Sequence, residues 1–436
     1  MSKSDRSSQG AAASPGREGR AVHGERARRR PVSLACGGAL SRAISVALLV
    51  SVAGALAAGL SAPAWGAERG VTATEVIIGT STPLSGPAAP WGATARGAEA
   101  YIRYINEQGG IHGRRLRFEV RDDAYLPPRA VANVRELVDR VGVFALVGLI
   151  GTANTLAVRD YVVDNQVIWI TPTADANLWV GYPRTRYLFV TYPNYYHEAV
   201  ILGRYAMEEL GARRLAVFYQ NDDYGKTGLA GVQRAVHDRG GDARIVAAVP
   251  YELTETDVSS HALRLRQSGA DALIIYATPR HGAMIAGEIA KIGYQPHRLS
   301  TFTLADPVMA TLAGPAWEGM IVPAFFDFPG TNPKVDRVLE IISGYNPELR
   351  RTPFNALAGV AFLEPFLEGL RRAGRDLTRE RFVQAMETLD RWEGELLTGV
   401  TFGPGRRQGI HSIYLSQYRS GQPVRLTGWI EYPVEF

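Results

Sequence analysis

The sequence predicts an α/β protein with two doubly wound parallel-sheet lobes, and three observations lead to this fold class. The chain has 436 residues, 46% hydrophobic and 21% charged, which suits two globular lobes better than one. Short apolar runs alternate with stretches of helical periodicity, which is typical of repeated βαβ units and parallel sheets. The alternation occurs twice, over 75–171 and again over 214–302. Two such series predict two similar lobes.

The first series begins with an apolar run that ends at Pro83 and the turn 85–87. Strands are expected at 75–81, 115–120, 144–148 and 167–171. Apolar residues then repeat at i, i+3, i+4 and i+7 of a helix face, at Ala98, Tyr101, Ile102 and Ile105, and the helix stops at Gly109-Gly110. The same spacing recurs at Val134, Leu137, Val138 and Val141. A further helix is expected over about 153–164.

The second series has the same rhythm. Its strands are expected at 214–219, 243–249, 272–276 and 299–302, and its helices near 196–210, 226–240, 258–268 and 280–292. The rhythm breaks from about residue 320. Beyond that point we expect a strand at 319–326, helices near 333–345, 355–373 and 378–388, and strands near 412–418 and 424–431.

The N-terminal region has the pattern of a secretory signal peptide. Arginines 28–30 and Arg42 precede a continuous apolar run at 43–60, and small residues follow it. We expect a cleaved, periplasmic mature form that starts between Trp65 and Glu68; the alternative is an N-terminal membrane anchor. The formal net charge of +5 arises mostly in this leader, so it gives no argument for a nucleic-acid partner.

Few sequence features favour catalysis or a bound cofactor. Cys36 is the only cysteine and lies in the leader, so the processed protein is expected to have no disulfide, thiolate nucleophile or cysteine metal site. The segment GLIGTA at 148–153 lacks the G-x-G-x-x-G spacing of a dinucleotide loop. The histidines show no metal-ligand spacing, and no G-x-S-x-G elbow is present. We therefore predict no metal, no cofactor and no enzymatic activity.

The loops that follow the strands carry the more informative pattern. In open α/β sheets the loops at the carboxyl ends of the strands line the ligand crevice. These loops are 83–91, 148–154, 171–175, 192–196, 220–224, 277–281 and 301–306, and many are rich in hydroxyl and aromatic side chains. Such loops can hydrogen-bond a small polar ligand and enclose its apolar part.

Several motifs resemble one family. The segment LSGPAAPWGATARGAEAYIRYINEQGGIHGRRLRFEVRDDAYLPPRAV at 84–131 is similar to the N-terminal signature of the leucine/isoleucine/valine-binding proteins. Further matches follow in order, at VGLIGT (147–152), ITPTA (170–174), NDDYGKTG (221–228), GADALIIY (269–276) and EGMIV (318–322). Members of this family are periplasmic substrate-binding components of branched-chain amino-acid ABC transporters. The resemblance covers essentially the whole chain after the leader.

The resemblance implies two lobes joined by three crossovers, near residues 192, 323 and 404. The leader is then 1–67, the N-terminal lobe combines 68–191 with 324–403, and the C-terminal lobe combines 192–323 with 404–436. The lobes of this family close on a ligand by a hinge motion, and a membrane permease reads the closed form.

The resemblance also implies binding residues in the N-terminal lobe. Trp91 would pack on the apolar part of the ligand, and Thr152 would supply a hydroxyl. The backbone around Thr173 and Ala174 would bind the ligand's carboxylate close to a helix N-terminus. Asp175 stands where the family prefers Ser or Thr and would repel a carboxylate, so either its side chain turns away or the ligand differs.

In the C-terminal lobe, Tyr224 takes an aromatic position of the site. Thr278 stands where amino-acid binders have an aromatic residue, and the segment around Thr303 lacks the glutamate that usually pairs with the ligand ammonium. Tyr195 belongs to an aromatic cluster with Tyr192 and Tyr196 at the first crossover. Pocket lining and hinge packing remain alternatives for that cluster.

The sequence thus predicts a periplasmic substrate-binding protein, a monomer, that captures a small amino-acid-like or carboxylate ligand for the permease of an ABC importer. The missing glutamate also leaves room for an aromatic acid, an amide or a short-chain carboxylate. The alternative is a ligand-sensing module of the same fold that feeds a signalling partner. A secreted α/β enzyme is the third interpretation.

Overall fold

The computed structural model describes residues 68–436. The signal peptide, its cleavage site and Cys36 lie outside the described residues or at their edge, so they stay predictions. Within the described part of the chain, no helix combines the length and the apolar character needed to cross a membrane.

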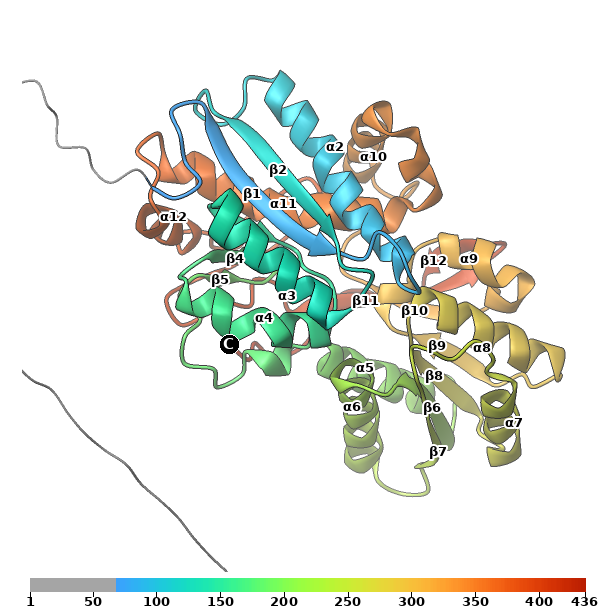
Figure 1. Cartoon of the computed structure of the whole chain (residues 1–436). Coiled ribbons are helices and arrows are strands. Elements are labelled where there is room, and N and C mark those ends of the chain that lie inside the picture. Colours follow the sequence, from blue (N-terminus) through green and yellow to red (C-terminus); the bar gives the residue numbers. More distant parts are fainter. Residues whose placement is uncertain (1–67) are drawn as a thin grey trace, which may run out of the picture. The chain divides into compact units, whose positions relative to one another are not determined.

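The first sheet is fully parallel and has the strand order β2-β1-β3-β4-β5 (Figure 1). Its strands are β1 (Glu75–Thr82), β2 (Arg115–Asp122), β3 (Ala145–Val147), β4 (Ile168–Ile170) and β5 (Leu188–Phe189). The connecting helices are α2 (Ala93–Glu107), α3 (Pro127–Arg135) and α4 (Thr152–Asp164). On α2 the predicted apolar face is the buried one, since Ala98, Ile102 and Ile105 are all buried. The lobe therefore forms as its hydrophobic pattern predicts.

The second sheet has the strand order β12-β11-β10-β9-β8-β6-β7, and β13 pairs with β11. Its strands are β6 (Arg214–Gln220), β7 (Arg244–Tyr251), β8 (Ala272–Tyr276), β9 (His297–Ser300), β10 (Ile321–Ala324), β11 (Ser412–Arg419), β12 (Gln422–Arg425) and β13 (Ile430–Glu431). Its helices are α5 (Tyr195–Glu208), α6 (Asp223–Arg239), α7 (Ser259–Ser268), α8 (Pro279–Lys291) and α9 (Val308–Ala313). Strands β6 to β10 are parallel, whereas β11 runs antiparallel to β10.

The chain crosses between the two sheets several times (Figure 1). It leaves β5 for α5, leaves β10 for α10 (Pro333–Tyr345), α11 (Pro353–Ala373) and α12 (Arg379–Met386), and returns at β11. Helix α11 packs against α2 of the first lobe. The crossing places are close to 192, 323 and 404, but the lobe boundaries themselves stay a prediction.

The structure differs from the sequence expectations at several places, including α9, a helix that was not expected. Strand β5 has only two residues, and no strand was expected there. The helix expected through 141 is an α-helix to Arg135 followed by a π-helical turn over Glu136–Val141. The single strand expected over 424–431 is two short strands, β12 and β13, which are separated by residues 426–429. Such short elements exist through pairing with a neighbour and not through local propensity.

Candidate ligand-binding site

A small cavity of about 40 Å³ lies between the two lobes. Its lining comes from both lobes: Trp91, Thr94, Tyr125, Ile150, Gly151, Thr152, Thr173, Tyr192, Tyr195, Tyr224, Phe302, Thr303, Phe325, Phe354, Asn355, Ala358 and Phe362. More than half of these residues are aromatic. None of these lining residues, all within the described part of the chain, is charged. The space holds only a few water molecules, so the protein is in a closed form.

The N-terminus of α4 meets this cavity. Gly151 is the N-cap residue, with φ at 111°, and no side chain of the described residues caps α4. A Cβ at this position would lie 2.7 Å from Cε2 of Tyr125, so glycine is needed both for the backbone conformation and for the ring. The Asp175 backbone N–H donates to the hydroxyl of buried Thr152 at 3.1 Å, which leaves the Thr152 hydroxyl proton to donate elsewhere. A buried helix end without a cap can bind an anion.

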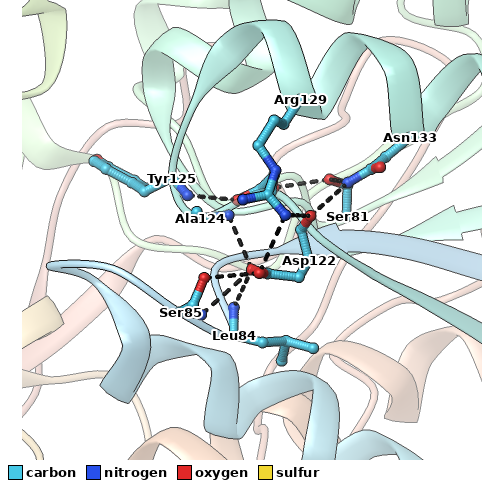
Figure 2. Close-up of polar contacts among 9 residues, drawn as sticks. Ser81, Leu84, Ser85, Asp122, Ala124, Tyr125, Arg129 and Asn133 are labelled. Carbon is cyan, nitrogen blue, oxygen red and sulfur yellow. Dashed lines mark hydrogen bonds and ion pairs between the residues drawn. The ribbon is translucent and has the colours of Figure 1, made fainter.

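Two adjacent carboxylates hold the loops that carry Trp91 and Tyr125 (Figure 2). Asp122 accepts hydrogen bonds from the Leu84 backbone at 2.9 Å and from the Ser85 hydroxyl at 2.7 Å, and it pairs with Arg129. Asp123 is buried and accepts from the Ser81 hydroxyl and the Tyr125 backbone, both at 2.8 Å. Burial raises the pKa of Asp123 to about 6. The pair thus joins the end of β1 to the end of β2, which places the two rings beside each other.

Trp91 connects the lobes across the cavity. Its indole N–H donates to the Thr303 carbonyl at 2.8 Å, and its ring lies edge-on to Tyr125 with centroids 5.5 Å apart. The Thr303 hydroxyl and the Tyr224 hydroxyl are hydrogen-bonded at 2.9 Å. These contacts join an N-terminal-lobe ring to a C-terminal-lobe turn and close one side of the cavity.

Two further contacts join the lobes beside the cavity. The Thr227 hydroxyl donates to Oδ2 of Asp175 at 2.5 Å, and the Asn355 backbone donates to Oδ2 of Asp306 at 2.8 Å. Asp175 also caps the short helix that follows it, through the Asn177 backbone. The Asp175 side chain therefore faces away from the cavity, so it does not oppose a carboxylate there.

Glu198 supports the cavity from behind. It lies in the first turn of α5 and is fully buried, outside the lining. Its carboxylate accepts from the Phe302 backbone at 2.6 Å, the Tyr276 hydroxyl at 2.8 Å and the Thr301 hydroxyl at 3.0 Å. Burial raises its pKa to about 8. Glu198 thus holds the turn that presents Phe302 and Thr303.

The fold and the cavity can now be compared with those of known proteins. The sequence profile described as "Periplasmic binding protein" matches residues 75–423. The chain belongs to the periplasmic binding protein family. Among curated relatives, a Leu/Ile/Val-binding protein homolog of Brucella melitensis biotype 1 is 25% identical over 335 residues, which are 76% of this chain and 86% of the relative. This similarity agrees with the resemblance seen in the motifs.

Solved structures show the same fold. A fatty acid ABC transporter substrate-binding protein from Thermomonospora curvata has a TM-score of 0.76 at 23% identity, over 84% of this chain and 94% of that one. A branched-chain amino acid ABC transporter protein from Thermus thermophilus, solved with bound valine, has a TM-score of 0.73 at 20% identity, over 82% and 97%. The two-lobed fold predicted from the sequence is therefore confirmed.

Six of the nine predicted binding residues meet at the cavity: Trp91, Thr152, Thr173, Tyr195, Tyr224 and Thr303. Ala174, Asp175 and Thr278 lie outside its lining. Thr278 is buried behind it, where its hydroxyl pairs with Nδ1 of His281 at 2.7 Å. Of the aromatic cluster, Tyr192 also lines the cavity, while Tyr196 faces a separate surface groove. Among the described residues, no cluster of three or more potential metal ligands occurs.

Sequence reasoning missed a second group of lining residues, namely Thr94, Tyr125, Phe325, Phe354, Asn355, Ala358 and Phe362. Five of them come from the crossover after β10 and from α11. The rule that ligands bind at loops following the strands of a sheet does not cover these segments. One sequence signal was available. Phe354 and Asn355 follow Pro353 directly, and a proline at the first helical position marks the N-terminus of a helix.

The pKa of Glu198 predicts a specific pH dependence of stability. Because the folded-state pKa of about 8 lies above the ordinary value of 4.5, the native state retains a proton that the unfolded chain loses. The contribution of Glu198 is fully present below pH 4.5 and decreases as the pH rises to about 8, by up to about 1.4 kcal/mol per pH unit. We expect the free energy of unfolding of wild type to fall relative to that of Glu198→Gln across this window.

Urea unfolding of both proteins at several pH values between 5 and 8 measures this difference. Glu208→Gln is the matched control, because Glu208 is an exposed residue on the same helix, and its difference from wild type should stay constant. A constant difference for Glu198→Gln as well would mean that Glu198 is ionised in the native protein throughout the range.

Proposed function

We propose that this protein is the substrate-binding component of an ABC importer. It captures a small amino-acid-like or carboxylate ligand between its lobes, delivers it to a membrane permease and performs no catalysis. The observation that carries the proposal is the small interlobe cavity with the N-terminus of α4 at one side, where no side chain of the described residues caps the helix. The Leu/Ile/Val-binding name of the curated relative supports it. Of the two solved structures, one is a fatty acid ABC transporter substrate-binding protein and the other holds valine, so the fold itself does not choose the ligand.

Binding follows from the contacts around the cavity. The ligand carboxylate takes the first-turn N–H groups of α4 together with the Thr152 hydroxyl, and the Thr173 backbone borders the same end. The apolar part of the ligand packs between Trp91 of one lobe and Tyr224 of the other. Carboxylate and apolar part together bridge the two lobes.

Closure then creates contacts that an open form lacks. The hydrogen bonds Trp91 to Thr303, Thr227 to Asp175 and Asn355 to Asp306 each join the two lobes. They form together only when the lobes meet, so they stabilise a single closed arrangement. A permease that binds this arrangement distinguishes the loaded protein from the empty one.

The proposed place of action is the periplasm, reached through a cleaved signal peptide that leaves a mature form starting between Trp65 and Glu68. The apolar run 43–60 and the small residues after it support this. We propose a monomer, since one chain supplies both walls of the cavity. N-terminal sequencing of the protein from its host tests the export step, and an intact chain in the membrane fraction would contradict it.

Thr152→Val tests the binding site. Calorimetry with leucine, 4-methylpentanoate and phenylacetate should show saturable one-to-one binding of at least one of them to wild type. The variant removes one hydroxyl that donates to a carboxylate, and such a bond contributes roughly 1.5–3 kcal/mol. The affinity for that compound should therefore fall by about tenfold to a hundredfold.

The matched control is Thr155→Val, one turn along the same helix. The Thr155 hydroxyl is buried, lies outside the lining and has no hydrogen-bond partner among the described residues. Its replacement should leave the affinity unchanged. Binding that is equally strong in Thr152→Val and wild type would remove α4 from the site, and absence of binding by all three compounds would count against the proposed function.

A further inference from the structure

We propose that the cavity selects an organic acid that has an apolar or aromatic body and no ammonium group. This inference rests on the proposed binding function and names the class of ligand. It follows from three observations. The lining is uncharged, the buried acids near the cavity already accept hydrogen bonds from other residues, and the N-terminus of α4 lies at one side of the cavity.

The lining contains nothing that can neutralise an ammonium group. None of its residues in the described chain is an aspartate or glutamate, and four are the phenylalanines Phe302, Phe325, Phe354 and Phe362. The hydroxyls of Tyr192 and Tyr195 are hydrogen-bonded to each other at 2.7 Å. An ammonium group brought here would lose its hydration shell without gaining an anionic partner, which is strongly unfavourable.

The buried acids around the cavity are engaged elsewhere. Glu198 accepts from three donors of the second lobe, as described above. Asp175 accepts from the Thr227 hydroxyl and the Asn177 backbone, and Asp306 accepts from the Val308 and Asn355 backbones, both at 2.8 Å. None of the three lines the cavity. Recruiting Asp175 or Asp306 for an ammonium would break a hydrogen bond that joins the lobes, and recruiting Glu198 would break the bonds that hold the turn of Phe302 and Thr303.

A negatively charged group, in contrast, has a favourable place at the N-terminus of α4. Gly151 and Thr152 line the cavity at the N-terminus of α4, a helix of 13 residues without a side-chain cap. The helix dipole and the free N–H groups favour a negative group at this end. The cavity thus has one end suited to a carboxylate and a body suited to rings or branched alkyl groups.

An aromatic lining also suits a quaternary ammonium ion, which binds to ring faces by cation–π attraction. Such a cation would lie in the same small cavity as the positive end of α4. That end would then remain buried without a partner, at a cost in free energy. The geometry therefore favours an organic acid over a quaternary ammonium ion as the ligand. One binding experiment with probes of both kinds distinguishes these two ligand classes.

The experiment compares four probes by calorimetry on the dialysed, leaderless chain: leucine, 4-methylpentanoate, phenylacetate and glycine betaine. Leucine and 4-methylpentanoate share the same branched carbon body and carboxylate and differ in the ammonium group. We expect 4-methylpentanoate or phenylacetate to bind at least about ten times more tightly than leucine.

Leucine binding as tight as that of the acids would overturn the inference and leave the proposed function standing. Tight binding of glycine betaine alone would overturn it in favour of a cation-binding cavity. Binding of none of the four would count against the proposed function itself.

A charge-introducing variant tests the cause. Asn355 lines the cavity at the third position of α11, where aspartate is compatible with a helix start. Asn355→Asp should raise the leucine affinity relative to that of 4-methylpentanoate by about tenfold or more. Asn346→Asp adds the same charge outside the lining, at a cap that aspartate also satisfies, and should leave the ratio unchanged. An unchanged ratio in Asn355→Asp would show that the missing anion does not exclude leucine.

Discussion

Gly359→Ala should lower the free energy of unfolding by about 3 kcal/mol, the upper part of the range for overpacked cores. The reason is the contact between α2 and α11. A Cβ on Gly359 would lie 1.8 Å from the Thr94 carbonyl oxygen, and a Cβ on Gly97 would lie 2.1 Å from the Ala356 carbonyl oxygen. Both obstacles are backbone atoms, so a side-chain rotation cannot relieve the clash and the helices must separate.

The same substitution should weaken ligand binding, because α11 contributes Phe354, Asn355 and Phe362 to the cavity and α2 contributes Thr94. Urea unfolding and calorimetry with 4-methylpentanoate measure the two effects. Gly287→Ala in α8 is the control. No atom of residues 68–436 lies within 4 Å of its added Cβ, so the substitution should stabilise the protein by about 0.5–1 kcal/mol. A Gly359→Ala protein as stable as wild type would mean that the two helices pack less closely than described.

Trp91→Ala should reduce the affinity for phenylacetate about a hundredfold. The variant removes a large ring from the cavity wall, where it packs edge-on to Tyr125, and it removes the hydrogen bond to the Thr303 carbonyl. Truncation of an aromatic anchor at the centre of a binding site commonly costs about 2 kcal/mol or more of binding free energy, and about 2.7 kcal/mol corresponds to this factor. Trp91→Phe retains a ring and loses only the indole N–H, so its loss should be about fivefold to tenfold.

The control for Trp91→Phe is Trp317→Phe in the second lobe. Trp317 is fully buried, lies outside the cavity lining, and its indole N–H has no partner among the described residues. Its replacement should leave phenylacetate affinity unchanged. Equal affinity of wild type and Trp91→Ala would show that Trp91 closes the lobes without contacting the ligand.

Local patterns predicted most of the secondary structure. The helical spacing of Ala98, Ile102 and Ile105 produced α2 with that face buried, and the apolar runs near 75, 214 and 272 produced β1, β6 and β8. These predictions succeeded because periodicity depends on neighbours in the chain. Strand β5 could not be predicted in this way. It has two residues and is a strand only because β4 lies alongside it.

The site divides along the same line. Trp91, Thr152 and Tyr224 could be predicted from the sequence, because parallel strands bring the loops at their carboxyl ends to one edge of the sheet. Asn355 and Glu198 could not be predicted in this way. Asn355 lies at the cavity because α11 packs against α2, which is far from it in the sequence. Glu198 is hydrogen-bonded to Phe302, which lies 104 residues further along the chain.

By itself, then, the sequence determined the two series of βαβ units, the family and several of the loops that line the cavity, because each depends on local spacing or on a motif. Only the tertiary structure decided the charge of the cavity. The sequence contains enough acids to bind an ammonium group, but Asp175, Glu198 and Asp306 accept hydrogen bonds from partners brought close by packing. Whether a buried carboxylate is available to a ligand depends on which donors lie within about 3 Å of it, and distant segments of the chain supply those donors.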